Sequence, residues 1–158
     1  MISPYIKRVR AAIGHDLLLI PSVAVLPRDD FGRVLLVRHT DSGAWATIGG
    51  SIEPDETPED AARREAEEEA GVVVELRGLL TVVGGPGYQV VYPNGDETAY
   101  VSVVYDAVVR SGAPRPDGDE TSEVGWFTVG ELPSLRLDEL NRLLLGAVFD
   151  DEGLGRQR

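Results

Sequence analysis

The chain has 158 residues, 42% hydrophobic and 27% charged, which is ordinary for a globular protein and long enough to predict a single domain over residues 1–158. The absence of cysteine excludes disulfides, thiolate metal sites and cysteine nucleophiles. A net charge of −12, with one lysine and no basic run, argues against binding to bulk nucleic acid.

No stretch of the sequence resembles a membrane span or a secretion signal. No apolar run approaches about 18 residues, and the first ten residues, MISPYIKRVR, lack the apolar stretch of a signal peptide. We therefore expect no membrane contact and a cytoplasmic location.

The first third of the chain predicts one helix and three strands. The helix is expected over 3–13 and the strands over 17–25, 33–38 and 45–48. Apolar residues at helical spacing, ended by Gly14, indicate the helix. The two longer strands are apolar runs separated by the turn sequence Asp29-Asp30-Phe31-Gly32, so we expect them to form a hairpin.

Residues 50–72, GSIEPDETPEDAARREAEEEAGV, predict a glycine turn, an acidic loop and a capped helix. Thr57 is suited to cap the helix, Pro58 fits its first position, and Gly71 can adopt the left-handed conformation that ends it. The helix is therefore expected over residues 58–70. This stretch carries −7 of the total charge of −12.

Three glutamates of this helix share one face, because Glu65, Glu68 and Glu69 stand at i, i+3 and i+4. Each such like-charge pair costs about a few tenths of a kcal/mol in an isolated helix. A bound cation would relieve the repulsion, and carboxylate oxygens suit Mg²⁺ or Mn²⁺. A solvated acidic helix face is the alternative interpretation.

The remaining chain predicts strands and a closing helix. The strands are expected over 72–83, 88–92, 98–109 and 123–128, and the helix over 137–149. The Asn94-Gly95 pair between the second and third of these strands predicts a hairpin. Residues 110–120 are expected to form a loop and 150–158 a frayed tail. The core-facing residues expected on the closing helix are Leu137, Leu140, Leu143, Leu144 and Val148.

The order of residues in the acidic stretch matches every specified position of the Nudix box. That pattern is a glycine, five residues, a glutamate, seven residues, and then Arg-Glu-apolar-any-Glu-Glu-any-Gly-apolar. Here Gly50 and Glu56 occupy the first two positions, and the remainder runs from Arg64 to Val72. The chain therefore resembles the Nudix hydrolases.

The sequence before the box also resembles that family. Trp45 and the pair Gly49-Gly50 are similar to a strand end that usually reads Trp, then Pro-Gly-Gly. Ile48 replaces the proline, which we expect to loosen the turn without removing a ligand. The missing cysteine argues against Nudix-related isomerases, which resemble this box but rely on a catalytic cysteine.

The resemblance implies an α+β fold, an α/β/α sandwich whose mixed central sheet is flanked by helices. It also implies hydrolysis of a nucleoside diphosphate linked to another moiety, by attack of water at phosphorus. The metal ligands would be Glu68, Glu69 and the main-chain carbonyl of Gly49, with Glu65 a ligand or the general base. Arg64 would orient a glutamate through charge-assisted hydrogen bonds. Mg²⁺ or Mn²⁺ would neutralise the pyrophosphate and activate water.

Two further roles stay open at the level of sequence. Some relatives use a loop acid as the general base, so Glu120 or Glu123 is a rival to Glu65, although plain solvation explains such loop acids equally well. Arg38, at a predicted strand end, is a candidate phosphate contact because guanidinium matches phosphate bidentately. A surface arginine paired with an acid is the alternative.

The substrate is expected to be a small nucleotide: a nucleoside triphosphate, ADP-ribose or a nucleotide sugar, or a dinucleoside polyphosphate. Pro86 and Tyr88, beyond the box, resemble the markers of different subfamilies and conflict. Tyr88, Tyr92 and Tyr100 are candidates to stack on a base, whereas a strand aromatic more often belongs to a core. A homodimer is an option, because many relatives pair. The alternatives to an enzyme are a nucleotide-binding sensor and a module in which metal merely stabilises the fold.

Overall fold

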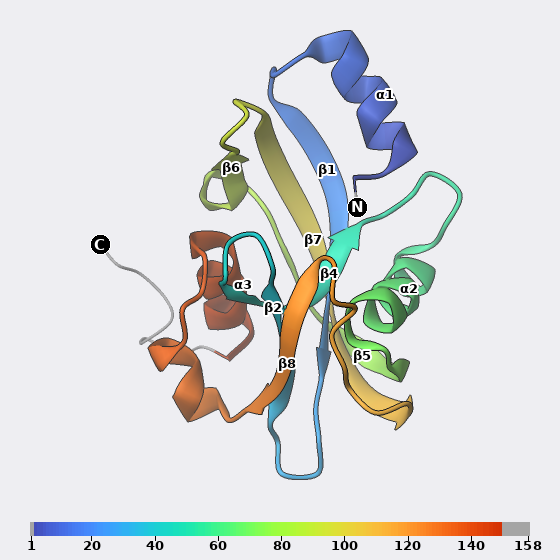
Figure 1. The fold of residues 1–158 in the computed structure, drawn as a ribbon, viewed down its shortest axis with the longest axis vertical. Helices are drawn as coiled ribbons and strands as arrows, with labels where there is room; N and C mark the ends of the chain where they lie inside the picture. Colours follow the sequence, from blue (N-terminus) through green and yellow to red (C-terminus); the bar gives the residue numbers. More distant parts are fainter. Residues whose placement is uncertain (1, 150–158) are drawn as a thin grey trace.

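The computed structural model describes residues 2–149, which form two sheets between helices (Figure 1). The helices are α1 (Pro4–Ile13), α2 (Pro58–Ala70) and α3 (Glu139–Phe149), with 3₁₀ turns η1 (Pro86–Tyr88) and η2 (Val129–Ser134). The strands are β1 (Leu18–Pro27), β2 (Val34–His39), β3 (Trp45–Ala46), β4 (Ile48–Ser51), β5 (Val73–Val83), β6 (Gln89–Val91), β7 (Glu97–Ser111) and β8 (Thr121–Phe127). The expected tail over 150–158 lies outside the described residues.

The larger sheet is mixed, as predicted. Its order is β4-β1-β7-β5, with β6 also pairing with β7, and β1 and β7 run parallel while the other neighbours are antiparallel. A second, antiparallel sheet has the order β3-β2-β8. In Figure 1, α2 and α3 lie on opposite sides of these sheets and α1 lies at one end, beside β1.

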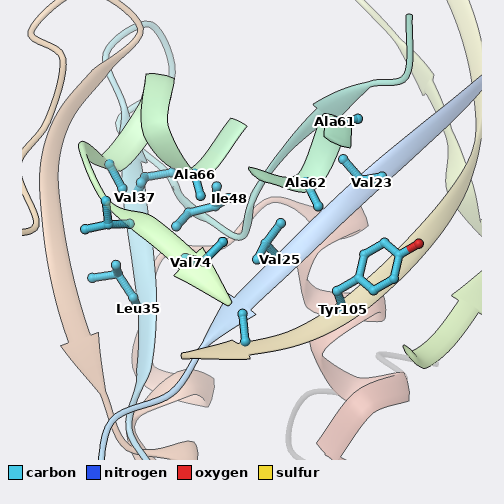
Figure 2. Close-up of a cluster of buried hydrophobic side chains, with 13 residues drawn as sticks. Val23, Val25, Leu35, Val37, Ile48, Ala61, Ala62, Ala66, Val74 and Tyr105 are labelled. Carbon is cyan, nitrogen blue, oxygen red and sulfur yellow. The ribbon is translucent and has the colours of Figure 1, made fainter. Parts of the chain in front are cut away.

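Each side of the sheets has its own apolar core. Alternate residues of β1 and β2 point to opposite sides, so both strands contribute to both cores, and the buried runs 23–26 and 34–37 are apolar throughout. The core beneath α2 contains Val23, Val25, Leu35, Val37, Ile48 and the alanines of α2 (Figure 2). The core beneath α3 contains Ala24, Leu26, Val34, Leu36, Leu144 and Leu145. This burial accounts for the continuous apolar runs in the sequence.

The predicted hairpin of β1 and β2 is wrong. The turn itself forms, because the Asp29 carboxylate accepts the N–H groups of Phe31 at 3.0 Å and Arg33 at 2.8 Å. After one isolated bridge between Arg28 and Val34, however, the strands enter different sheets. A turn sequence specifies a chain reversal, but strand partners are set by which apolar faces can be covered.

The single strand expected around residues 45–48 is two strands in different sheets. The chain changes sheet at Thr47, whose N–H and hydroxyl both donate to Asn141 Oδ1 at 2.9 Å. Ile48, at the position where relatives usually carry proline, is fully buried and pairs with Val25. Ile48 therefore contributes a core side chain at this turn, and the loosening expected from the change stays a prediction.

The helix α2 confirms the sequence prediction in both its bounds and its caps. Thr57 Oγ1 accepts the N–H of Asp60 at 3.1 Å, and Gly71 ends the helix with a φ of 65°. Ala62, Ala66 and Ala70 are fully buried against the sheets. Small side chains let the helix approach closely, which sets the depth of its glutamates.

The closing helix differs from the prediction at its start and in its buried face. α3 begins two residues later than expected, because Leu137 instead forms a bridge with Trp45. Its buried residues are Asn141, Leu144 and Leu145, whereas Leu140 and Leu143 are only half-buried.

The helices described here are too short or too polar to cross a membrane. The cytoplasmic location stays a prediction, as does the single-domain organisation of residues 1–158.

Candidate active site

Two glycines of β4 allow the strand to touch the glutamate face of α2. A Cβ at Gly49 would lie 2.1 Å from the main-chain oxygen of Val23. A Cβ at Gly50 would lie 2.2 Å from Glu65 Oε1. Real Cβ atoms do not approach other atoms so closely, so Gly49, which faces main chain, requires glycine, whereas a Cβ at Gly50 would push the Glu65 carboxylate aside. The box glycine therefore makes room for a box carboxylate.

Two of the three predicted metal-binding glutamates are buried. Glu65 is 8% exposed and Glu69 is 4% exposed, whereas Glu68 lies at the surface. Glu69 Oε2 accepts the N–H of Gly49 at 3.1 Å. Burial, reinforced by the charge of Glu65, raises the pKa of Glu69 to about 8. Burial also raises the pKa of Glu65, against the opposing effect of Arg64. A bound cation would stabilise the charged form of two such neighbouring, partly desolvated carboxylates.

Arg64 connects the acids of the box to one another. Its Nε and Nη2 donate to the two oxygens of Glu56 at 3.0 and 2.6 Å, and these bonds lower the pKa of Glu56. Its Nη1 donates to Glu65 Oε1 at 2.8 Å and to Glu68 Oε2 at 3.2 Å. Nη2 also donates to the carbonyl of Ser51 at 3.1 Å. The guanidinium is thus engaged with the protein's own acids.

The carboxylates of α2 and the main-chain carbonyls of β4 offer only oxygen atoms as ligands, and a hard divalent cation prefers oxygen ligands. The buried pair Glu65 and Glu69 and the glycine contact with α2 support such a site. Within residues 2–149, however, no three acidic or imidazole side chains converge closely enough to hold an ion in this conformation. Here Arg64 binds Glu65 and Glu68 itself.

The loop before β8 is fastened to the end of α2. Thr121 Oγ1, fully buried, donates to the main-chain oxygen of Glu69 at 2.9 Å. The N–H of Arg115 donates to the carbonyl of Ala70 at 2.9 Å, and that of Thr40 donates to the carbonyl of Glu120 at 2.9 Å. These bonds fix the loop acids relative to the helix acids.

The acids line a cleft of about 780 Å³ that continues from the box to the N-terminal helix. Its acidic end includes Gly49, Gly50, Glu53, Arg64, Glu65, Glu68, Glu69, Asp119 and Glu120. Its other end includes Ile2, Ile6, Arg10, Ile20, Tyr92, Asp96, Thr98 and Tyr100. The volume is that of a typical small-molecule site.

A family model described as the NUDIX domain matches residues 18–145. The chain belongs to the Nudix family. A "MutT-like protein" of Streptomyces ambofaciens is 32% identical over 94% of this chain and 88% of its own length. An "ADP-ribose pyrophosphatase" of Methanocaldococcus jannaschii is 32% identical over 78% of this chain and 72% of its own length. A MutT Nudix hydrolase structure from Burkholderia pseudomallei superposes with a TM-score of 0.68, at 32% identity, covering 83% of this chain and 98% of that one.

Nudix membership confirms the predicted fold and enzyme class. The chain is a hydrolase of pyrophosphate bonds in nucleoside diphosphate derivatives, and members of this family generally need a divalent metal ion. The matched residues begin at β1, so α1 lies outside the matched range.

The structure does not bring two expected substrate-binding residues to the cleft. Arg38 donates to the carbonyl of Gly43 at 2.9 Å and to Glu123 at 2.8 Å, so its guanidinium is used on the surface. Tyr88 packs on the core beneath α3, and burial raises its pKa. Glu120 does line the cleft, together with the predicted acids of α2, whereas its rival Glu123 is the acid that pairs with Arg38.

Other cleft residues were not predicted to belong to the site. His39 is the last residue of β2, Asp41 follows that strand, and Asp119 precedes β8. The signal in the sequence was weak: each is a polar residue at a strand end, and only the pairing of β2 with β8 brings these ends together. Of the candidate stacking tyrosines, Tyr92 and Tyr100 line the cleft.

Proposed function

We propose that the chain hydrolyses a small nucleoside diphosphate derivative at its pyrophosphate bond with the help of Mg²⁺ or Mn²⁺. The ligands would be Glu68, Glu69 and the main-chain carbonyl of Gly49, with Glu65 a further ligand or the general base. When bound, the ion supplies neutralisation of the pyrophosphate and activation of water. The observation that carries the proposal is the cleft, which joins these acids to a nucleotide-sized space.

Arg64 acts in this proposal as a positioning residue. Its bidentate contact with Glu56 and its bond to the carbonyl of Ser51 hold its guanidinium beside the middle of α2. From there its Nη1 directs carboxylate oxygens of Glu65 and Glu68. A lysine could not make the bidentate contact, so the residue type matters as well as its charge.

The general base in this proposal is Glu65 or Glu120. Glu65 keeps one carboxylate oxygen, Oε2, clear of the Arg64 contact. Glu120 lines the same cleft from the opposite loop, whose main chain is tied to Thr40. Comparing Glu120→Gln with Glu65→Gln separates them: loss of the base lowers kcat with little effect on KM.

The substrate subclass is best approached by a panel. It should hold nucleoside triphosphates, including oxidised guanine forms, ADP-ribose, other nucleotide sugars and dinucleoside polyphosphates. The name of the Methanocaldococcus jannaschii relative makes ADP-ribose the first compound to try. Phosphate is measured after phosphatase treatment of the products, with Mg²⁺ and then with Mn²⁺.

Glu69→Gln is the matched control for this panel. Glutamine keeps the size and the acceptor for the N–H of Gly49 but removes a metal-binding carboxylate. We expect turnover to fall about 100-fold or more with a melting temperature near that of the wild type. Unfolding of the variant would indicate that the acids serve stability. Nucleotide binding without turnover in the wild type would instead indicate a sensor.

A further inference from the structure

The end of the cleft away from the box has a different chemistry from the acidic end. Ile6 of α1 and Ile20 of β1 supply apolar surface, and Tyr92 and Tyr100 supply aromatic rings. Ile20 is buried, while Tyr92 is 40% exposed. The two tyrosine hydroxyls hydrogen-bond to each other, which links the two side chains across the turn between β6 and β7.

The helix α1 forms one wall of this end although none of its residues is buried. Arg10 attaches it instead. This side chain, 14% exposed, donates to the carbonyls of Gly14 and Asp16 and, across the cleft, to the carbonyl of Glu97 at 2.7 Å. It also donates to Thr98 Oγ1 at 3.0 Å. The helix α1, which has no buried side chain, is thus held at the mouth of the cleft by hydrogen bonds of Arg10.

The charges at this end favour an uncharged ligand group. The arginines among the described lining residues are Arg10 and Arg64, and the Nη donors of both are directed at protein oxygens. Asp96 lies beside Arg10, with 3.6 Å between Oδ2 and Nε. A phosphate placed here would meet a carboxylate and no available guanidinium, whereas a planar neutral ring would meet aromatic and apolar surface.

We propose that Ile6 of α1 and the pair Tyr92 and Tyr100 form the nucleobase subsite of this enzyme, held in place by Arg10. The occupant is the uncharged aromatic base of the nucleotide whose phosphates lie at the box acids. The proposal rests on the proposed function, because one ligand must span both ends of the cleft. Specificity for the base would then reside partly in α1, which precedes the residues matched by the family model.

Binding of products tests the subsite without requiring turnover. Titration calorimetry with Mg²⁺ compares nucleoside 5′-monophosphates of adenine, guanine, cytosine and uracil with ribose 5-phosphate, which lacks a base. We expect the wild type to bind at least one monophosphate about 10-fold more tightly than ribose 5-phosphate. Tyr92→Leu and Ile6→Ala should reduce that preference about 10-fold and leave ribose 5-phosphate unchanged.

Tyr5→Leu is the matched control, because Tyr5 is 42% exposed on the same helix and does not line the cleft. With the preferred substrate, Tyr92→Leu should raise KM at unchanged kcat, and Tyr5→Leu should change neither. An added 3′-phosphate on the ligand should weaken binding to the wild type. Tighter binding of that compound, or equal effects of Tyr92→Leu and Tyr5→Leu, would overturn the subsite.

The two proposals fail in different ways. If turnover is lost in Glu69→Gln but unchanged in Tyr92→Leu and Ile6→Ala, the proposed reaction stands and the proposed subsite is wrong. Base-dependent binding that Tyr92→Leu abolishes, in a protein that turns over nothing on the panel, would keep the subsite and remove the proposed reaction.

Discussion

Single positions on β4 decide whether the acids of α2 can reach the cleft. There is no free space for a Cβ at Gly49 or Gly50. The main chain of β1 fills that space at Gly49, and the side chain of Glu65 fills it at Gly50. The box glycine is therefore a steric requirement of the glutamate 15 positions later.

Gly50→Ala should damage the site more than the fold. The added methyl would displace the Glu65 carboxylate and its contact with Arg64 Nη1, so we expect kcat to fall about 10-fold or more. Steady-state kinetics and thermal unfolding measure the two effects separately. Gly130→Ala is the control, since a Cβ there meets nothing within 4 Å. Unchanged kcat in Gly50→Ala would mean that the position of Glu65 is unimportant.

At this scale the sequence predicted which carboxylates share one face of α2 but not how they are held. The spacing of Glu65, Glu68 and Glu69 follows from helix geometry alone. The burial of Glu65 and Glu69 depends on how closely β4 packs against α2, which no local pattern contains. Arg38 could not be assigned from sequence for the same reason, because its partner Glu123 comes from a strand 85 residues away.

Among the elements, α3 and α1 are attached in opposite ways. α3 packs Leu144 and Leu145 into a core and adds one polar contact, from Asn141 to the point where β3 gives way to β4. α1 has no buried residue and depends on polar contacts of Arg10 and the β6–β7 turn. The sequence predicted both helices by periodicity, but periodicity does not reveal what an amphipathic face meets.

Asn141→Leu should destabilise the protein although it increases apolar content. Asn141 Oδ1 accepts both the N–H and the hydroxyl of Thr47, and Nδ2 donates to Asp138. Leucine leaves two buried donors of Thr47 unsatisfied, at a cost of about 1–3 kcal/mol for each. Denaturant unfolding measures the loss. The double variant with Thr47→Val should recover part of it; no recovery would place the cause elsewhere.

The attachment of α1 should weaken in acid. Hydrogen bonds from His15 and then Asn94, with the nearby charge of Arg10, lower the pKa of Asp96 below its usual 3.8. Because the folded pKa lies below the unfolded one, the contribution of Asp96 to stability is complete above about pH 4 and is lost as pH falls through the folded value.

Comparison with Asp96→Asn isolates this effect. We expect the wild type to melt at a higher temperature than the variant near pH 7, and the difference to shrink as the pH falls below about 4. A difference that persists in acid would assign it to the geometry of the turn rather than to the charge of Asp96.

For the whole molecule, layers were predictable and the division into sheets was not. The sandwich was expected from the resemblance to the Nudix hydrolases, and Nudix membership confirms it. The apolar runs of β1 and β2 are nevertheless equally suited to pairing in one sheet or to joining two different sheets. The turn between them does not determine which of these forms. Buried positions on both faces, such as Val25 with Leu26 and Leu35 with Leu36, show that each strand needed cover on two sides.

β1 meets its parallel neighbour late in synthesis. Leu18 pairs with Thr98, 80 positions further along the chain, and a ribosome needs about 4–16 s to make that interval. Until then the strand has only the short β4 as a partner, and α2, which packs on both, has no finished sheet beneath it. Throughout those seconds an apolar strand is open to other nascent chains. The yield of folded enzyme therefore depends on what shields the growing polypeptide before residue 98 emerges.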